Sequence, residues 1–537
     1  MGDALGLEIK SLYEREKSNR HNWDQHWFEV AELVIPRRDQ IFETRYKTKG
    51  NKKRRKQYDA SAPHFLELLA SALHSMLTNP SVQWFELTTG DENIDKDPAV
   101  RKWLQELVRK IHQILNNTNF QTEVHEVYMD LGSLGTSVLR IEEDNEVVIR
   151  FKSSPINEHQ IVENYKGEVD GIFTENIYTI RQAVQKFGED VFKNNHELKN
   201  ILKDDKDEIS VIHAVIPRKD IKFGDKSPKS FKWASVHVHL DTGITLKESG
   251  FREFPYAVTR WNKSSGEKYG RSPSMKALPD IKMINSMMRD TIRAAQKVTD
   301  PPMFLPDEGI IGPINITPGG INYYRSGTPS IDGSIAKPFS TQANPGIGFD
   351  VMNDVRERIK QAYFIDQLQL REGPQMTATE VNQRTDEHLR LLGPILGRLH
   401  FELLKPLIAR IISIMKRKNV LPPNMPDILG QANIDVFFSS QIAKAQRIAE
   451  GDSLLRVMNM IGPLIEMDPT TMDNIDSDAI VQYVSKINGL PQNLLKEPKE
   501  VEAIRQQRQE QAVKQQQQQD QLVAAETMNK AAPMLQQ

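Results

Sequence analysis

The sequence has no cysteine among its 537 residues. Disulfide bonds, thiol catalysis and cysteine-ligated zinc sites are therefore excluded, and the composition fits a reducing compartment. The chain also lacks any continuous apolar run of about 18 residues, so no membrane-spanning helix is expected. Because charged residues begin at Asp3, the N-terminal stretch is not expected to act as a signal peptide.

A large excess of charge of either sign is missing as well. The 70 Lys and Arg residues nearly balance the 72 Asp and Glu residues, and the formal net charge is −2. No overall basic field therefore favours nucleic acid or an anionic membrane. The length exceeds what one hydrophobic core usually supports, so we expect about two to four domains or a large subunit of an oligomer.

Catalytic motifs are missing too. The segment Gly224–Ser227 lacks the glycine before lysine that a phosphate-binding loop requires, and no dinucleotide-binding, zinc-protease or serine-hydrolase motif is present. The acidic run Asp204–Glu208 lacks the spacing and central glycine of a calcium loop and is interpreted as a solvated turn. We expect neither an enzyme nor a bound cofactor or metal.

Two histidines, His237 and His239, fall on one face of the strand predicted over residues 231–240. A metal site would need a third ligand, and the sequence places none nearby. We therefore interpret this pair as part of an exposed strand face.

The most distinctive stretch is a pair of predicted helices around a turn-rich insert. Helical periodicity predicts one helix over residues 273–299, which Pro279 is expected to kink or restart, and a second over residues 349–370. The 48 residues between them, Pro301 to Gly348, contain eight prolines and eight glycines. This composition predicts a separate, turn-rich tip.

Both helices have apolar residues at spacings of three and four, which suits packing against other helices. We call this set the apolar seam; its members are Ile281, Ile284, Met288, Ile292, Val355 and Ile359. The remaining positions are largely charged, and Lys and Arg outnumber Asp between Arg271 and Asp300.

The rest of the chain reads as helices followed by antiparallel strands up to about residue 260, with a hairpin predicted at Asp144–Asn145. A capping box at Thr377 and Glu380 opens a long helix, which Gly393-Pro394 and Lys405-Pro406 are expected to kink. The Gln-rich tail from Glu497 is expected to be helical or disordered. The sequence therefore predicts an α+β, mainly helical protein.

Four stretches, in chain order, carry a resemblance to a known family. They read YDASAPHFLELLASALHSMLTNPSVQWFEL, YGRSPSMKALPDIKMINSMMRDTIRAAQKVTDPP, MTATEVNQRTDEHLRLLGPILGRLHFELLKPLI and GLPQNLLKEPKEVEAIRQQRQEQ. Together they resemble the portal proteins, or head-to-tail connectors, of T7-like short-tailed bacteriophages, over nearly the whole chain.

The resemblance implies a phage portal fold, in which each subunit of a ring has a wing, a helical stem, a clip and a crown. The implied wing covers residues 1–270 and 377–435. The implied stem helices are residues 271–300 and 349–370, the clip 301–348, the tunnel loop 371–376, the crown 436–496 and the C-terminal tail 497–537.

The resemblance also implies a function. Family members form a homo-oligomeric ring, expected here as a dodecamer, at one capsid vertex of the virion after assembly in the host cytoplasm. Double-stranded DNA is packaged and ejected through the ring without sequence specificity. The implied partners are the terminase large subunit, tail adaptor proteins, capsid and scaffolding proteins and, as an option, internal core proteins, but no membrane. The portal itself does not hydrolyse ATP.

A charged lining that ignores sequence suits the passage of a duplex. The DNA-channel candidates on the stem are Lys276, Lys282, Arg289, Arg293, Lys297, Arg356, Arg358 and Lys360. The tunnel-loop candidates implied by the resemblance are Arg371, Glu372 and Gln375.

Two other classes stay open on sequence. One is a structural adaptor of the phage tail or capsid vertex without a DNA channel. The other is a nucleic-acid enzyme whose site is built from scattered carboxylates.

Overall fold

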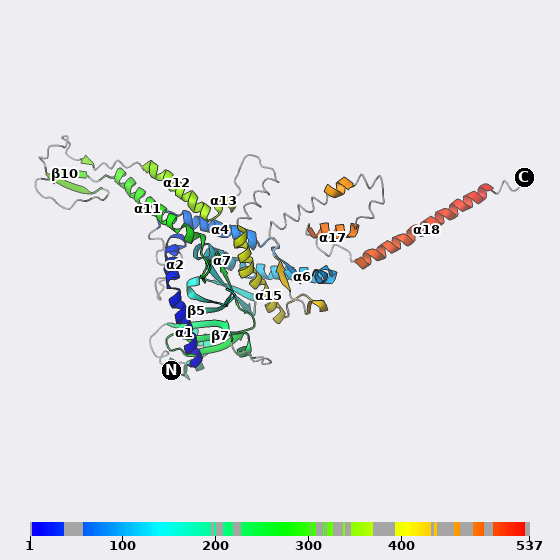
Figure 1. The fold of residues 1–537 in the computed structure, drawn as a ribbon, viewed down its shortest axis with the longest axis horizontal. Helices are drawn as coiled ribbons and strands as arrows, with labels where there is room; N and C mark the ends of the chain where they lie inside the picture. Colours follow the sequence, from blue (N-terminus) through cyan, green and yellow to red (C-terminus); the bar gives the residue numbers. More distant parts are fainter. Residues whose placement is uncertain are drawn as a thin grey trace. The chain divides into compact units, whose positions relative to one another are not determined.

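The computed structural model describes residues 3–36, 57–193, 195, 198–199, 208–218, 227–301, 303–307, 315, 317, 319–325, 337–338, 345–368, 392–430, 434–437, 456–461, 476–487 and 498–531 (Figure 1). The chain divides into two compact units. Unit 1 comprises Met1–Trp84 and Ile111–Leu421, and unit 2 comprises Phe85–Lys110 and Pro422–Gln537.

Unit 1 begins with a group of helices, α1 (Ala4–Asn19), α2 (His21–Val34), α4 (Ser61–Leu77) and α7 (Phe120–Leu134). The Asp3 side chain caps α1 by accepting a hydrogen bond from the Gly6 backbone N–H at 2.7 Å. α7 ends at Gly135, whose φ of 77° is in the left-handed region that favours glycine. α4 packs against α7 through Leu66 and Leu69, which are fully buried.

A three-stranded antiparallel sheet follows, in the order β3-β2-β9. Its strands are β2 (Thr136–Asp144), β3 (Val148–Ser154) and β9 (Tyr256–Arg260). β2 and β3 pair from Val138 with Ser154 to Asp144 with Val148, so the hairpin predicted at Asp144–Asn145 is confirmed. The central strand β2 thus pairs with β3, which follows it directly, and with β9, which lies more than a hundred residues later.

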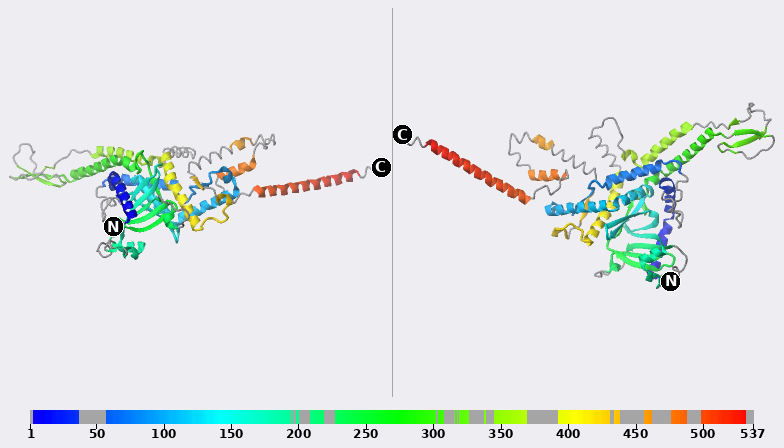
Figure 2. Two further views of the ribbon diagram at one scale, coloured as in Figure 1. Left: turned by 60° about the horizontal axis from the view of Figure 1, so that its bottom comes forward. Right: turned by 180° about the vertical axis from the view of Figure 1, so that it is seen from behind.

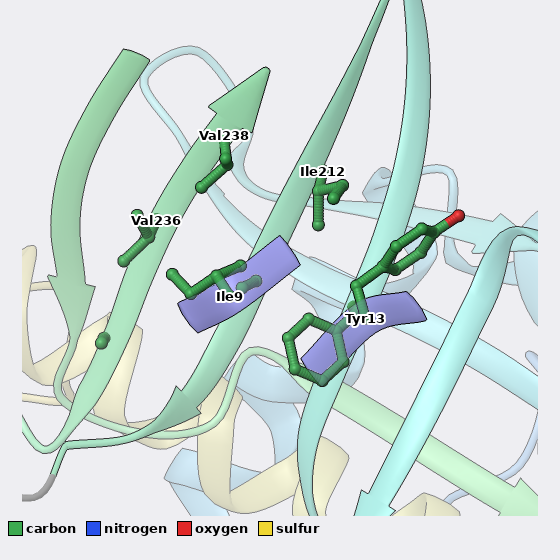
Figure 3. Close-up of a cluster of buried hydrophobic side chains, with 8 residues drawn as sticks. Ile9, Tyr13, Ile212, Val236 and Val238 are labelled. Atoms are coloured by element: carbon green, nitrogen blue, oxygen red, sulfur yellow. The ribbon is translucent and has the colours of Figure 1, made fainter. Parts of the chain in front are cut away.

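A second antiparallel sheet has five strands in the order β4-β5-β6-β7-β8. They are β4 (His159–Glu163), β5 (Val169–Thr179), β6 (Glu208–Pro217), β7 (Trp233–His239) and β8 (Thr245–Phe251), and α8 (Ile180–Phe187) and α9 (Glu189–Lys193) follow β5. Helix α1 covers one face: Ile9 and Tyr13 pack against Ile212, Val236 and Val238 (Figure 3). Burial of this alternating apolar face holds the helix on the sheet.

Two long helices, α11 (Pro273–Thr299) and α12 (Pro345–Ala362), form a pair, which we call the helix pair (Figures 1 and 2). α11 has the predicted bounds and continues through Pro279 without a break. α12 begins earlier than the predicted start at Phe349 and ends before the predicted end at Leu370. The short helix α13 (Ile365–Leu368) follows.

The insert between α11 and α12 contains a small sheet in the order β11-β10-β12. β10 (Met303–Asp307) pairs in parallel with β11 (Ile321–Arg325) and antiparallel with β12 (Lys337–Pro338). The prediction of a turn-rich tip did not foresee these strands.

The last helical stretch of unit 1 covers residues 392–417. A single π turn, His400–Leu404, lies between residues 392–399 and α15 (Lys405–Arg417). Gly393-Pro394 lies in the first described turn of this helix, and the π turn lies next to Lys405-Pro406.

Unit 2 contains β1 (Glu86–Thr88), which pairs antiparallel with β13 (Asp435–Phe437). Its helices include α5 (Glu92–Lys96), α17 (Ser477–Ile487) and the long α18 (Pro498–Ala531), and α6 (Pro98–Asn117) starts in this unit. The Gln-rich tail is thus helical as far as Ala531. Helices and antiparallel sheets together confirm the α+β class.

Candidate functional site

The helix pair carries most of the residues singled out in the sequence. At the start of α11 the Ser272 side chain accepts a hydrogen bond from the Met275 backbone N–H at 3.0 Å, and Pro273 occupies the first turn. The Ser272 hydroxyl also donates to the Ser133 carbonyl oxygen at 2.6 Å. These contacts fix the start of α11 to the end of α7.

A second contact joins the start of α11 to the end of α12. The Ser274 hydroxyl lies 2.6 Å from the Gly132 carbonyl oxygen and 2.6 Å from the Tyr363 hydroxyl, and these groups are buried. The next residue, Phe364, has a φ of 59°. Because a helix cannot continue through this left-handed conformation, α12 ends here rather than at Leu370.

The apolar seam is buried along only part of its length. Ile281 and Ile284 on α11 and Val355 and Ile359 on α12 are at most 3% exposed. Met288, farther along α11, is half-buried, and Ile292 is 41% exposed. Within one subunit, the seam therefore packs only near the start of α11 and the end of α12.

The far end of the helix pair leaves large apolar side chains in solvent. Ile292 and Val298 on α11, and Phe349 and Val351 on α12, are each more than two-fifths exposed. A lone exposed apolar residue is ordinary, but a group of them on one element marks a surface for contact with other chains.

Three of the DNA-channel candidates share one side of α11. Lys282, Arg289 and Arg293 are spaced by seven and four positions, which places them on the same face of the helix. We call these three residues the basic face. Since successive residues turn by about 100°, the seam residues Ile281 and Ile284 point elsewhere.

Two members of the basic face have acidic neighbours. Lys282 Nζ lies 2.7 Å from a Glu29 carboxylate oxygen on α2, and Arg289 Nε lies 3.0 Å from Asp290. All four side chains are more than a third exposed, and such pairs contribute only about 0–1 kcal/mol.

The remaining α11 candidates are less engaged than Lys282 and Arg289, although the Asp290 carboxylate acts electrostatically on Arg293. Among the described residues, no ion pair is found for Lys276, Arg293 or Lys297. Lys276 and Arg293 are exposed and Lys297 is half-buried. These three cations are therefore the most available for an anionic partner.

The α12 candidates are engaged within the subunit. Arg358 lies 3.3 Å from Asp280 on α11, and Lys360 lies 2.8 Å from Asp366. Arg356 donates to the Asp59 carboxylate, and its Nη2 lies 2.8 Å from Asp59 Oδ2. These pairs connect α12 to its neighbours.

The start of α4 is held by both helices of the pair. Asp59 Oδ2 accepts from Arg356 of α12, while its Oδ1 accepts from the Ser61 backbone N–H at 2.9 Å. Asn285 of α11 accepts from the Tyr58 backbone N–H at 2.6 Å. Burial raises the pKa of Asp59, but the hydrogen bonds from Arg356 and Ser61 outweigh this effect and hold the pKa below its ordinary value.

The tunnel-loop candidates Arg371, Glu372 and Gln375 lie outside the described residues. Their placement as channel residues stays a prediction.

The interpretation of His237 and His239 as an exposed strand face is wrong. His237 is 8% and His239 2% exposed, because the second face of the five-stranded sheet is also covered. His237 stacks on His213, with ring centroids 4.1 Å apart. His159 lies 2.9 Å from Thr174 in the same cross-strand row.

This histidine row is buried and electrically neutral. Burial first, and then nearby cations including Arg140, lower the pKa of His159 and of His237 to about 3. The same causes, with His237 as a neighbour, hold the pKa of His213 well below its ordinary value. Within the described residues, no cluster of three or more His, Asp or Glu could hold a metal ion.

An ion-pair network at the end of β9 was not predicted from the sequence. Arg260 is 3% exposed and donates to Glu402 in the π turn, with Nη2 to Oε1 at 2.7 Å. It also pairs with Glu163, which in turn accepts from Lys263. The signal for this contact was Pro406, which marks an irregular helical turn, but no sequence pattern identifies its partner.

No helix in the described part of the chain combines the length and apolarity that a bilayer crossing requires.

A model of the family described as "Bacteriophage head to tail connecting protein" matches residues 7–495. The chain belongs to this family. Two relatives of this head-to-tail connecting protein carry the word portal in their names. The chain is 31% identical to the "Probable portal protein" of Bordetella phage BPP-1 over 507 residues, which is 93% of this chain and 90% of the relative. It is 29% identical to the "Portal protein" of Salmonella phage epsilon15 over 503 residues, 92% of this chain and 89% of the relative. The resemblance to phage portal proteins is thereby confirmed.

Two solved structures also align with this connecting protein. "Virion of native gene transfer agent (GTA) particle" is 11% identical with a TM-score of 0.32, covering 72% of this chain and 88% of the other. "Neck of empty GTA particle computed with C6 symmetry" is 10% identical with a TM-score of 0.35, covering 73% and 86%. Both TM-scores are low, so the family assignment rests on the sequence matches.

Proposed function

We propose that copies of this chain form a ring at one vertex of a phage capsid and that double-stranded DNA is packaged and ejected through it. Membership of the connecting-protein family and the two relatives named as portal proteins support this role. We expect the ring to be a dodecamer, assembled in the host cytoplasm and retained in the virion.

The helix pair is the observation that carries the proposal. A ring needs two different contact faces on each subunit, because its interface is heterologous. The exposed apolar residues at the far end of the helix pair, among them Ile292 and Phe349, supply such a contact surface. The basic face of α11 points away from the apolar seam, so packing along the seam leaves it free.

A charged wall suits the passage of DNA because phosphate contacts carry no sequence information. Arg293, Lys276 and Lys297 are the strongest channel candidates, since none of them forms a salt bridge with a described residue, although the Asp290 carboxylate acts electrostatically on Arg293. Lys282 and Arg289 remain candidates because their ion pairs are exposed and weak. Arg356 and Lys360 are better explained as residues that hold the subunit together. Arg358 remains a candidate, because its ion pair with Asp280 is exposed and weak.

The proposed layout follows the family. The wing comprises residues 1–270 and 377–435, and the helix pair forms the stem. The insert between α11 and α12 would be the clip, where tail adaptor proteins dock. Residues 371–376 would be the tunnel loop, residues 436–496 the crown, and the α18 tail would follow it. The ring would also be the platform for the terminase large subunit, and would contact capsid, scaffolding and internal core proteins.

Electron microscopy of the purified full-length chain tests the proposal. We expect rings with an open central hole, viewed end on. Closed particles without a hole would instead favour a structural adaptor of the tail or vertex. Cleavage of DNA by the same preparation with added divalent metal, lost on chelation, would favour a nucleic-acid enzyme.

A further inference from the structure

The π turn in the last helix of unit 1 has a defined cause. The Lys405 backbone N–H donates to the His400 carbonyl oxygen, five residues back, as in a π-helix. Pro406 has no N–H to offer the Glu402 carbonyl oxygen, so a regular α turn would also lack a hydrogen bond here. A π turn is equivalent to one extra residue inserted in an α-helix.

The apolar pattern of this helix contains the same extra residue. Before the π turn ends, the buried leucines are spaced by four, three and four: Leu392, Leu396, Leu399 and Leu403. After it, a second series starts one position later with Leu404 and continues through Leu407, Ile408 and Ile411. The first series also continues past the π turn, because Leu407, Ile411 and Ile414 follow Leu403 at spacings of four, four and three and are buried as well. The helix therefore has an apolar stripe both with the extra residue and without it.

Glu402 in the π turn is clamped by the network at the end of β9. Its carboxylate accepts from the Arg260 backbone N–H at 2.9 Å, from Nε at 3.2 Å and from Nη2 at 2.7 Å. The two side chains are 3% and 11% exposed. Burial lowers the pKa of Arg260, but the Glu402 and Glu163 carboxylates outweigh this effect and raise the pKa above its ordinary value. The Arg260 guanidinium therefore stays charged.

Glu402 also has a second partner on its own helix. Arg398 Nη1 lies 3.6 Å from Glu402 Oε1, at the four-residue spacing that suits an α-helix. The carboxylate would therefore keep a cationic neighbour if it left Arg260. The segment before the π turn is also permissive, because an added Cβ at Gly393 or Gly397 would meet nothing within 4 Å.

We propose that the π turn and the Arg260–Glu402 ion pair form a two-position joint. In the position described here, the extra residue lies in the π turn and Glu402 faces Arg260. In the second position, the turn becomes α-helical and Glu402 turns to Arg398. Residues 392–399 then rotate by about 100° and shift by about 1.5 Å relative to α15. Both positions keep the helix intact, and the ion pair selects between them.

The place of the joint gives it a role. Arg260 is followed by Trp261, which contacts Phe364 beside the end of α12, with ring centroids 6.3 Å apart. The joint therefore sits where the helix of residues 392–417 approaches the start of the helix pair. If the proposed channel is right, rotation at the joint couples the stem to the wing. The existence of the joint does not depend on that channel.

Distance measurement by pulsed electron paramagnetic resonance tests the joint, and the cysteine-free sequence makes site-specific labelling direct. One label is attached at Gly397→Cys, before the π turn, and the other at Tyr165→Cys. Tyr165 is 93% exposed and lies on the turn between β4 and β5. This turn is fixed relative to Arg260, because the Gly167 carbonyl oxygen accepts a hydrogen bond from the Arg260 guanidinium. Labelled chain is diluted with unlabelled chain in the native assembly. We expect Glu402→Gln to raise the population of a second distance about tenfold.

The matched control is Glu143→Gln, which removes an exposed partner of Arg417 on the same helix beyond the π turn. It should leave the distance distribution as in the unsubstituted chain. The same distribution in Glu402→Gln and in the unsubstituted chain would overturn the proposal.

Hydrogen exchange of the unsubstituted chain gives a second test, which holds even if Glu402→Gln fails to fold. The joint predicts that the Lys405 amide exchanges at least about tenfold faster than the Ile411 amide in α15, because the π turn must break to switch. Equal protection of the two amides would show a rigid turn and would overturn the joint.

Discussion

The Asp59 carboxylate and the Arg356 guanidinium form an ion pair 2.8 Å long between residues almost 300 positions apart. The Asp59 side chain is only 5% exposed and also accepts a hydrogen bond from the backbone N–H of Ser61, the first residue of α4. A single carboxylate therefore connects α4 to the helix pair.

Removal of Arg356 should destabilise unit 1. Arg356→Ala is expected to lower the free energy of unfolding by about 1–3 kcal/mol, because a buried carboxylate loses its charged partner. Chemical denaturation measures the change. Arg358→Ala is the control: its pair with Asp280 is exposed, so a loss of about 0–1 kcal/mol is expected. Equal losses in the two variants would contradict a special role for Asp59.

The two isoleucines of the apolar seam on α11 should behave differently. Ile292→Asp should leave the subunit folded but impair ring assembly, because Ile292 is 41% exposed in one chain. Ile284→Asp should destabilise the subunit itself by more than about 3 kcal/mol, because it buries a charge. Circular dichroism and size-exclusion chromatography with light scattering separate the two effects. A complete ring of the Ile292→Asp chain would refute the first expectation.

The basic face should influence DNA rather than assembly. Replacement of Lys282, Arg289 and Arg293 together by Gln should leave rings intact and reduce the DNA content of purified particles. The control replaces three exposed cations outside the helix pair, Arg109, Lys166 and Lys229, and should have no effect. Unchanged DNA content in the first variant would remove these residues from the channel.

The buried histidine row should make the five-stranded sheet sensitive to acid. In the folded chain the pKa of His237 is lowered to about 3, whereas in the unfolded chain it keeps its ordinary value of about 6.5. Between these two pH values the unfolded chain therefore binds more protons than the folded chain. Stability is therefore full above about pH 6.5 and falls as the pH drops below it. Each such histidine adds a slope of up to about 1.4 kcal/mol per pH unit.

Urea unfolding between neutral pH and mild acid measures that slope. His237→Gln should reduce it, since one titrating group is lost. Val238→Ala, on the opposite face of β7, should lower stability while keeping the slope of the unsubstituted chain. An unchanged slope in His237→Gln would show that this histidine does not titrate on unfolding.

The close approach of Gly135 to Gly270 gives a steric prediction. A Cβ at Gly135 would lie 2.3 Å from the Gly270 carbonyl oxygen, and its φ is 77°. Gly266 has a similar φ of 81° with open space around it. Gly266→Ala should cost about 1–2 kcal/mol from the backbone alone, and Gly135→Ala clearly more. Thermal unfolding compares the two, and equal costs would show that the backbone relieves the clash.

Local signals account for what the sequence could predict. Ser272-Pro273 and Asp300-Pro301 bound α11, and each acts through the backbone next to it, so both ends were predicted correctly. The hairpin at Asp144–Asn145 is local in the same way.

Contacts between distant segments account for the rest. The end of α12 depends on Tyr363 meeting Ser274, and the burial of His237 depends on what covers the second face of its sheet. The alternation along a strand shows on which face of the sheet each side chain lies, but not whether other elements pack on that face. The exposure of Ile292 shows the same limit for a helix, since spacing alone does not distinguish contacts within a chain from contacts between chains.

The pairing of β1 with β13 sets an order for folding during synthesis. Residues 86–88 meet residues 435–437, so unit 2 cannot close until the ribosome has released most of the chain. Closing so long a loop costs only slightly more entropy than closing a shorter one, so the delay is one of time rather than of stability. Unit 1 is complete by Leu421 and can form first. Until Asp435 emerges, β1 remains an unpaired strand edge, which makes the nascent chain most prone to association in that interval.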